Sequence, residues 1–332
     1  MNSTLFKRVA ALLFALCMLP FAACGQSASD EGTEPAGSVV STTATTTTVA
    51  STTVTTTTTT TVAETTVTTT TTTIIPTTTT TQAPTTTTTA KPQKQWELYW
   101  SDEFDGNSLD TSKWNIELGT NGEIVKKAEN VKIEDGDCVI TVRRDDSTPG
   151  FDYSSAYVTT ANKFSFCFGR LEFRAKLPTG QGMWPALWTL GDNYLTIAND
   201  EKAWPLCGEI DVMELVGSSD PQNPFSNKKI MGTLHWGSDR DSHEQAHKAL
   251  LLADSPSDDY HIYAVEWDVD EMVWFVDDRE YMRVSLDAPD MGMAFMQKHW
   301  IIMNINLYGH DDTTPDEAQM YVDYVRVYKE KK

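Results

Sequence analysis

The stretch GEIDVMELVG, residues 208–217, decides how the folded part of this chain is interpreted. Its apolar residues alternate with acidic ones as in a strand, where every second side chain lies on one face. Glu209 and Asp211 follow that period, whereas Glu214 is out of step by one residue. A β-bulge at residues 212–213 would return Glu214 to the shared face, because a bulge inserts one extra residue into a strand. We therefore expect three carboxylates on one face of a bulged strand.

Three carboxylates on one strand face require a wet cleft, because burying them in a core would be very costly. Like charges so close push their pKa values apart and leave an acid and a base at neutral pH, the pair that glycoside hydrolysis uses. Four strand steps separate the Cα atoms of Glu209 and Glu214 by roughly 13 Å, which leaves both retaining and inverting chemistry open. An acidic strand edge or a calcium-binding patch is the alternative interpretation.

Residues 95–332 are predicted to form one all-β domain. Segments such as EDGD, PTGQG and DDTTPDE provide turns between short alternating runs. Many strands at short spacing favour a β-sandwich or jelly roll over βαβ units. One helical window, DSHEQAHKALLL at residues 241–252, is equally compatible with a loop. The expected strands are DCVITVRR, SAYVTT, FSFCFGRLEFRAKLP, MWPALWTLG, GEIDVMELVG, IMGTLHWG, YHIYAVEWD, MVWFVDD, HWIIMNINLYG and MYVDYVRVYK.

Residues 1–23 are predicted to be a lipoprotein-type signal peptide. Lys7 and Arg8 precede an apolar run, VAALLFALCMLPFAA, that is too short for a comfortable membrane span. Small residues then lead to Cys24, a pattern that resembles a bacterial lipoprotein signal with Cys24 as the lipidated residue. We expect an exported protein on the cell surface that meets the membrane only through this lipid. Plain secretion is the alternative.

Residues 24–94 are predicted to be a Thr-rich, low-complexity linker. Between residues 40 and 90 the chain is mostly Thr, with no aromatic residue and no Gly. Such a tract buries too little apolar surface to offset its ordering entropy, so we expect a disordered, solvated spacer that is open to O-glycosylation. A Thr-rich β-stack is the alternative, although no apolar face repeats along the tract.

The charge of the chain limits its partners. The formal net charge is −21, and most of the acidic residues follow residue 95. A negative field of this size argues against nucleic acid and sulfated polymers and permits a neutral substrate. All ten Trp lie after residue 94, many beside Gly, Pro or acidic residues, as in sugar-binding surfaces and also in cores.

Three cysteines remain after the signal segment: Cys138, Cys167 and Cys207. No C-x-x-C or His/Cys cluster indicates zinc. We expect three buried thiols, since free Cys packs as a small hydrophobe, with one disulfide as the alternative.

The motifs of this chain resemble glycoside hydrolase family 16. GEIDVMELVG is similar to the catalytic strand E-[IL]-D-x-x-E of that family in its bulged, laminarinase-like form. LYWSDEFDG and LDTSKW resemble the opening of the family, and GRLEFRAKLPTGQGMWPALW, GTLHWG, YHIYAVEWD and MYVDYVRVY follow in the expected order. The resemblance covers residues 97–329. It implies a concanavalin A-like jelly roll of two antiparallel sheets with the cleft on the concave face.

The resemblance also implies the chemistry. Glu209 would be the nucleophile, Glu214 the general acid and then the base, and Asp211 the residue between them that tunes both. The reaction would be internal cleavage of β-1,3-linked glucan with retention, without a cofactor for the chemistry. We expect a monomer. A mixed-linkage β-1,3-1,4-glucanase is the neighbouring alternative, and a non-catalytic glucan-binding protein is the alternative from another class.

The same resemblance identifies further site residues. Flat Trp rings can stack on sugars or pack in a core, and His235 is either a cleft residue or a structural one. Asn121 survives where many laminarinases carry Asn-x-Glu, whereas Tyr157 stands where the family often has an arginine, which leaves substrate preference in doubt. The substrate-binding candidates are Trp184, Trp188, Trp204, His235, Asn304 and Asn121.

A structural calcium is implied on the convex face, bound largely by backbone carbonyls and one Asp. The matching positions are Glu103, Gly136 and Asp323. Oxygen ligands from distant strands suit calcium. The alternative is that Asp323 is an ordinary exposed residue.

Overall fold

The computed structural model describes residues 45–62, 65–82, 94–197, 203–220, 222–223, 226–288 and 290–331. The expected signal peptide and Cys24 lie outside these ranges. The chain divides into two compact units, one that contains Lys94–Lys332 and one over Ala23–Gln93. Within the described ranges, no helix has the length and apolarity that a membrane crossing requires.

The Thr-rich unit differs from the disordered spacer that we expected. Its described residues form a two-stranded antiparallel hairpin of β1 (Thr45–Val62) and β2 (Thr65–Gln82). The physical reason is that β-branched Thr favours extended backbone even where no apolar face exists to be buried. Thr45 is paired with Gln82, so the two ends of the hairpin lie side by side and its length adds nothing to the reach of a tether.

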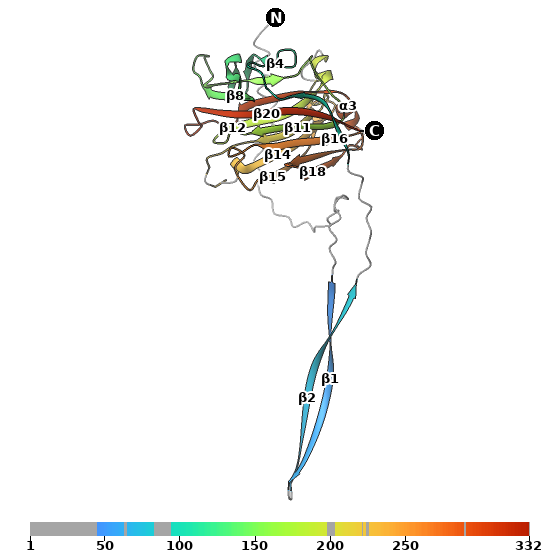
Figure 1. Ribbon diagram of the computed structural model, residues 1–332. Coiled ribbons are helices and arrows are strands. Elements are labelled where there is room, and N and C mark those ends of the chain that lie inside the picture. The colour runs from blue at the N-terminus through green and yellow to red at the C-terminus, as the bar shows by residue number, and fades with distance from the viewer. Residues whose placement is uncertain are drawn as a thin grey trace. The chain divides into compact units, whose positions relative to one another are not determined.

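The larger unit contains a seven-stranded antiparallel sheet (Figure 1). Three adjacent strands near its centre contribute the residues of the candidate site. In spatial order the strands are β15 (Glu244–Leu251), β14 (Lys229–Trp236), β13 (Glu209–Leu215), β12 (Met183–Gly191), β19 (His299–Leu307), β10 (Tyr157–Thr159) and β4 (Asn115–Glu117).

A second, eleven-stranded sheet forms the other layer. Its main path runs β18 (Arg279–Ser285), β17 (Glu271–Val276), β16 (His261–Trp267), β11 (Gly169–Lys176), β20 (Glu317–Glu330), β8 (Asp137–Arg144), β9 (Tyr153–Ser155), β6 (Ile124–Lys126) and β5 (Gly119–Asn121). Off this path, β3 (Trp96–Asp102) pairs with β20 and β7 (Val131–Glu134) with β8. The helical elements are η1 (Ala128–Asn130), η2 (Asp192–Leu195), η3 (Ser226–Lys228), η4 (Arg240–Ser242) and α3 (Met291–Phe295).

One hydrophobic core joins the two sheets. Inward-facing residues of both layers belong to a single cluster, for example Ile210 and Leu234 from one sheet and Leu171 and Val265 from the other. Trp274 of the larger sheet also donates a hydrogen bond to a main-chain carbonyl of β13 at 2.8 Å. Alternating strands that bury one face against another sheet give this two-layer architecture. The predicted jelly-roll fold and the predicted strands are confirmed.

The helical window at residues 241–252 is not a helix. A short η4 turn is followed by β15, which pairs with β14 over its whole length. Tertiary pairing at a sheet edge overrides the helix propensity of Ala, Lys and Leu here. All three cysteines after the signal segment are free thiols; Cys138 and Cys207 are buried, and Cys167 is half-buried.

Candidate active site

The predicted bulge lies in β13. Against β14, Asp211 is paired with Thr233 and Glu214 with Met231, so two residues of β13 stand opposite one residue, Gly232. The register against β12 shifts at the same place. This extra residue restores the side-chain alternation after Asp211, and the carboxylates of Glu209, Asp211 and Glu214 all face one pocket.

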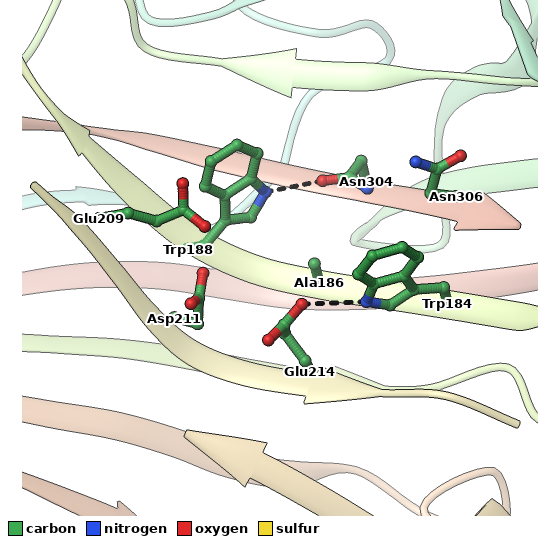
Figure 2. A pocket seen from close by; sticks show the side chains of 8 residues that line it. All are labelled: Trp184, Ala186, Trp188, Glu209, Asp211, Glu214, Asn304 and Asn306. Carbon is green, nitrogen blue, oxygen red and sulfur yellow. Dashed lines mark hydrogen bonds between the residues drawn. The ribbon is translucent and has the colours of Figure 1, made fainter. Parts of the chain in front are cut away.

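The pocket lies on the face of the seven-stranded sheet that points away from the core. Figure 2 shows its wall, which is contributed by three adjacent strands. Residues two apart on each strand share this face, so β12 presents two indoles and β19 two amides. The lining residues are Trp184, Ala186, Trp188, Glu209, Asp211, Glu214, Asn304 and Asn306.

The three candidate tryptophans are neither free stacking platforms nor simple core residues. Trp184 is 3% exposed, Trp188 8% and Trp204 7%. Each of the three indole N–H groups has a hydrogen-bond partner in the site. Trp184 donates to Glu214 Oε1 at 3.0 Å, and Trp204 donates to Glu209 Oε2 at 2.9 Å. Trp188 donates to Asn304 Oδ1 at 2.7 Å. Trp184 and Trp204 therefore fix the positions of the two glutamates, and the rings of Trp184 and Trp188 line the pocket.

His235 lies on β14, directly opposite Glu209 of β13. Its Nε2 is 3.3 Å from Asp211 Oδ2 and 4.0 Å from Glu209 Oε1. Its Nδ1 is 2.9 Å from Nε2 of His243, whose ring stacks on it. Burial lowers the pKa of His243 to about 4, so at neutral pH this second ring is an uncharged hydrogen-bond partner that orients His235.

The carboxylates of the site resist ionisation. Burial raises the pKa of Glu209 well above its ordinary value, and the charge of Asp211 adds to this, whereas His235 opposes it. Burial also raises the pKa of Asp211, with the charge of Glu214 as the next cause, and the pKa of Glu214, where His235 and Trp184 act in the opposite direction. Three buried, neighbouring carboxyl groups are not all ionised at once. This leaves at least one protonated carboxyl, a proton donor, beside an ionised partner.

Asn121 reaches the site indirectly. Its Nδ2 donates to the hydroxyl of Tyr157 at 2.6 Å, and Asn306 Nδ2 donates to the same hydroxyl at 3.3 Å. The predicted Asn121 thus does not line the pocket; it holds Tyr157, which contacts the lining residue Asn306.

Of the residues expected to bind calcium, Asp323 lies on β20 of the larger sheet, Glu103 directly follows β3, and Gly136 precedes β8. Both oxygens of Glu103 accept from Arg326, at 3.0 and 2.7 Å, and Asp323 Oδ2 accepts from Arg174 at 2.6 Å. Asp323 is the extra residue of a bulge in β20, and Gly136 lies in the turn before β8 with φ 88°. Arginine side chains therefore occupy some of the carboxylate oxygens that a cation would need as ligands.

One neighbouring oxygen remains for a cation. Asp137, next to Gly136, accepts from the Tyr260 hydroxyl through Oδ2 at 2.6 Å, while its Oδ1 is buried without a partner. An orphaned buried carboxylate oxygen beside Asp323 fits an oxygen-ligated ion such as calcium.

Asn306, Ala186 and His243 belong to the site and were missed from the sequence. Asn306 had a readable signal, since it lies two residues after Asn304 on the same strand face. His243 had none, because its place beside His235 depends on how the η4 turn folds back at the end of β14.

A cleft on a β-sandwich with paired carboxylates, each held by an indole, defines a glycoside hydrolase. The sequence comparisons agree. Residues 93–330 match a family model described as "Beta-porphyranase A-D, GH16 domain". The chain therefore belongs to glycoside hydrolase family 16, and within it is similar to the laminarinases.

Three relatives illustrate that similarity. "Glucan endo-1,3-beta-glucosidase A1" of Niallia circulans is 36% identical over 269 residues, which is 70% of this chain and 38% of the relative. "Beta-glucanase" of Rhodothermus marinus is 35% identical over 255 residues, 70% of this chain and 85% of the relative. The crystal structure of the laminarinase catalytic domain from Thermotoga maritima MSB8 has 35% identity and a TM-score of 0.63, covering 72% of this chain and 100% of that one. The chain thus spans about two fifths of the Niallia enzyme but nearly all of the other two.

Proposed function

We propose that this protein is a retaining endo-β-1,3-glucanase that hydrolyses internal bonds of neutral β-glucans. The observation that carries the proposal is the bulged strand that brings Glu209, Asp211 and Glu214 onto one pocket wall. The relatives named as β-glucanases support the substrate class. The net charge of −21 favours an uncharged polymer.

In the first step, Glu209 attacks the anomeric carbon while Glu214 protonates the departing glycosidic oxygen. The C–O bond of the substrate breaks, and an ester bond forms between the sugar and Glu209. The indole of Trp204 keeps one oxygen of Glu209 occupied, so the lone pairs of the other are available for attack. Burial raises the pKa of Glu214, which is the direction that a general acid needs.

In the second step, the deprotonated Glu214 removes a proton from water, and the water oxygen attacks the anomeric carbon. The ester bond to Glu209 breaks and the proton ends on Glu214, which restores the starting state. Two displacements retain the anomeric configuration. His235, whose Nε2 is 4.0 Å from Glu209 Oε1, stabilises the carboxylate as it returns.

Incubating the purified protein with laminarin, lichenan, agarose and a sulfated galactan, and measuring new reducing ends, tests this proposal. We expect the fastest release from laminarin as oligosaccharides of several lengths. Comparable release from lichenan would favour the mixed-linkage alternative, and release from the galactans alone would favour the activity in the family model's description. No release from any polymer would favour the glucan-binding protein.

We also propose that the protein is exported and held at a bacterial cell surface by a lipid on Cys24, as a monomer. The support is the sequence pattern of residues 1–24: a charged start, a short apolar run and small residues before the cysteine. A surface glucanase would then act on polymers outside the cell.

Calcium remains a proposal of the same kind. Asp323, Asp137 and backbone oxygens near Glu103 and Gly136 would hold the ion, and the ion would stabilise the sheet far from the chemistry. The buried, unpartnered Asp137 Oδ1 is the observation in its favour.

A further inference from the structure

One lining residue of the pocket, Asn306, is not used by the carboxylate chemistry. Its amide meets the Tyr157 hydroxyl, which also accepts from Asn121; the three residues come from β19, β10 and β5. Tyr157 is 5% exposed and Asn306 is 2% exposed, and their side chains meet at the Tyr157 hydroxyl. Two amides that converge on one buried hydroxyl form a rigid polar group rather than an adaptable surface.

The amide of Asn306 has a defined orientation. Its Oδ1 accepts from the backbone N–H of Leu307 at 2.9 Å, so its Nδ2 is turned toward the Tyr157 hydroxyl. An amide nitrogen carries two protons, and the hydroxyl takes one. Among the described residues no protein acceptor is found for the second, and Asn306 lines the pocket beside Asn304 (Figure 2). Since buried donors are nearly always satisfied, the missing acceptor is expected from a molecule in the pocket.

The electrostatics of this wall favour an uncharged partner. One cation lies beside the network: Lys126, whose Nζ is 4.9 Å from the centre of the Tyr157 ring. That ammonium is already paired with Glu117 at 2.7 Å. The lining residues contribute carboxylates and no basic side chain. A sulfate or carboxylate on the sugar would therefore be repelled, whereas a hydroxyl oxygen would accept the spare N–H.

We propose that Asn306 is a specificity-determining residue that donates a hydrogen bond to a hydroxyl oxygen of an uncharged sugar unit of the substrate. Tyr157 is its positioning residue, and Asn121 fixes Tyr157. The inference rests on the proposed function and names the chemistry by which that cleft selects a neutral glycan.

The test compares Asn306→Ala, Tyr157→Phe and the double variant on β-1,3-gluco-oligosaccharides of increasing length. We expect kcat/KM of Asn306→Ala to fall about 3- to 10-fold, mainly through KM, as for loss of one hydrogen bond. The bonds cut in long oligosaccharides should shift, because one binding position is weakened. Tyr157→Phe should fall less, and the double variant no further than Asn306→Ala, because both act through one contact.

The matched control is Tyr263→Phe. Tyr263 is fully buried on β16 in the other sheet, and its hydroxyl has no partner, so this change should leave KM and the cleavage pattern as in the wild type. Equal loss of kcat on every substrate, an unchanged cleavage pattern, or fully additive losses would overturn the inference.

Binding separates the inference from the proposed function. Calorimetric titration of a β-1,3-gluco-oligosaccharide into Glu209→Gln, with and without Asn306→Ala, reads the contact without turnover. Weaker binding by the Asn306 variant supports the inference, whether or not the wild type is active. Release of no reducing ends by the wild type would refute the proposed enzymatic function and not this inference. Equal binding by an otherwise active protein would overturn the inference alone.

Discussion

At the scale of single residues, the indole N–H groups decide how the two glutamates behave. Trp204 and Trp184 each donate to one oxygen of Glu209 and Glu214, and both contacts oppose the rise in pKa that burial causes. Both glutamates thus have the same type of partner. His235 lowers the pKa of both glutamates as well, whereas the charge of Asp211 raises the pKa of Glu209.

The proposed division of roles, with Glu209 as nucleophile and Glu214 as acid, predicts different products from two variants. Glu209→Ala lacks the nucleophile. Glu214→Ala lacks the general acid, which should lower its rate of hydrolysis about 10²- to 10⁴-fold. With an activated aryl β-glycoside, azide should restore turnover in both. In Glu209→Ala it attacks the sugar directly and gives the inverted glycosyl azide. In Glu214→Ala it intercepts the glycosyl-enzyme and gives the retained one, which nuclear magnetic resonance distinguishes.

Asp211→Asn is the matched control for these variants, since it makes no bond to the sugar and should lose less activity than either. The same anomer from both glutamate variants would refute the assignment, and an inverted product from the wild type would refute retention altogether.

The raised pKa of Glu209 predicts a cost in stability. The ordinary pKa of the group is 4.5, and its pKa in the folded state is higher. As pH rises above 4.5, Glu209 therefore ionises first in the unfolded chain, and this lowers the free energy of unfolding. Glu209→Gln removes that penalty. We expect its melting temperature to exceed that of the wild type by a few degrees at pH 7, with the difference shrinking toward pH 4.

Thermal melts at both pH values check this, with the exposed Glu97→Gln on β3 as a control that should change neither. A gain of equal size at the two pH values would mean altered packing, and a lower melting temperature at pH 7 would contradict the argument.

At the scale of elements, two bulges put carboxylates where regular strands would not. The bulge in β13 returns Glu214 to the pocket, and the bulge in β20 leaves Asp323 as an extra residue on the other sheet. In both places the chain gives up regular strand pairing, and a polar site results.

The second bulge is tested with a chelator. If calcium binds there, removing it should lower the melting temperature, since an ion at 100 times its Kd stabilises the fold by about 2.7 kcal/mol. Asp323→Ala should abolish the effect of the chelator and keep most activity at low temperature. Asp316→Ala, at an exposed ion pair with Arg144, is the control that should retain the effect. Identical melting curves of the wild type with and without chelator would remove calcium from the account.

At the scale of the whole molecule, the chain combines a catalytic unit with a Thr-rich unit whose described part is a hairpin. If Cys24 carries a lipid, Cys24→Ser should move the protein from the membrane fraction into the medium, because one polar side chain replaces the anchor. Cell fractionation followed by immunoblotting measures this, with Cys17→Ser in the apolar run as the control that should stay bound. Equal membrane retention of Cys24→Ser would rule out the lipid.

The bulge in β13 and the two-layer fold could be predicted from the sequence. These follow from a local period of two, from one break in that period and from turn residues, all of which are written in neighbouring positions. The roles of Trp184 and Trp204 were not determined in this way, because whether an indole stacks on sugar or hydrogen-bonds a carboxylate depends on residues 30 and 5 positions away, respectively.

The remaining features depend on tertiary contacts. Tyr157, Asn121 and Asn306 are far apart in sequence and meet because β10 pairs with β19 and Asn121, the last residue of β5, donates to the Tyr157 hydroxyl. The edge strand at Glu244–Leu251 and the Thr-rich hairpin exist because partner strands supply hydrogen bonds that local propensity does not specify. The physical reason is common to all of them: a contact between distant segments is fixed by strand pairing and register, and neither is encoded in any short stretch of the chain.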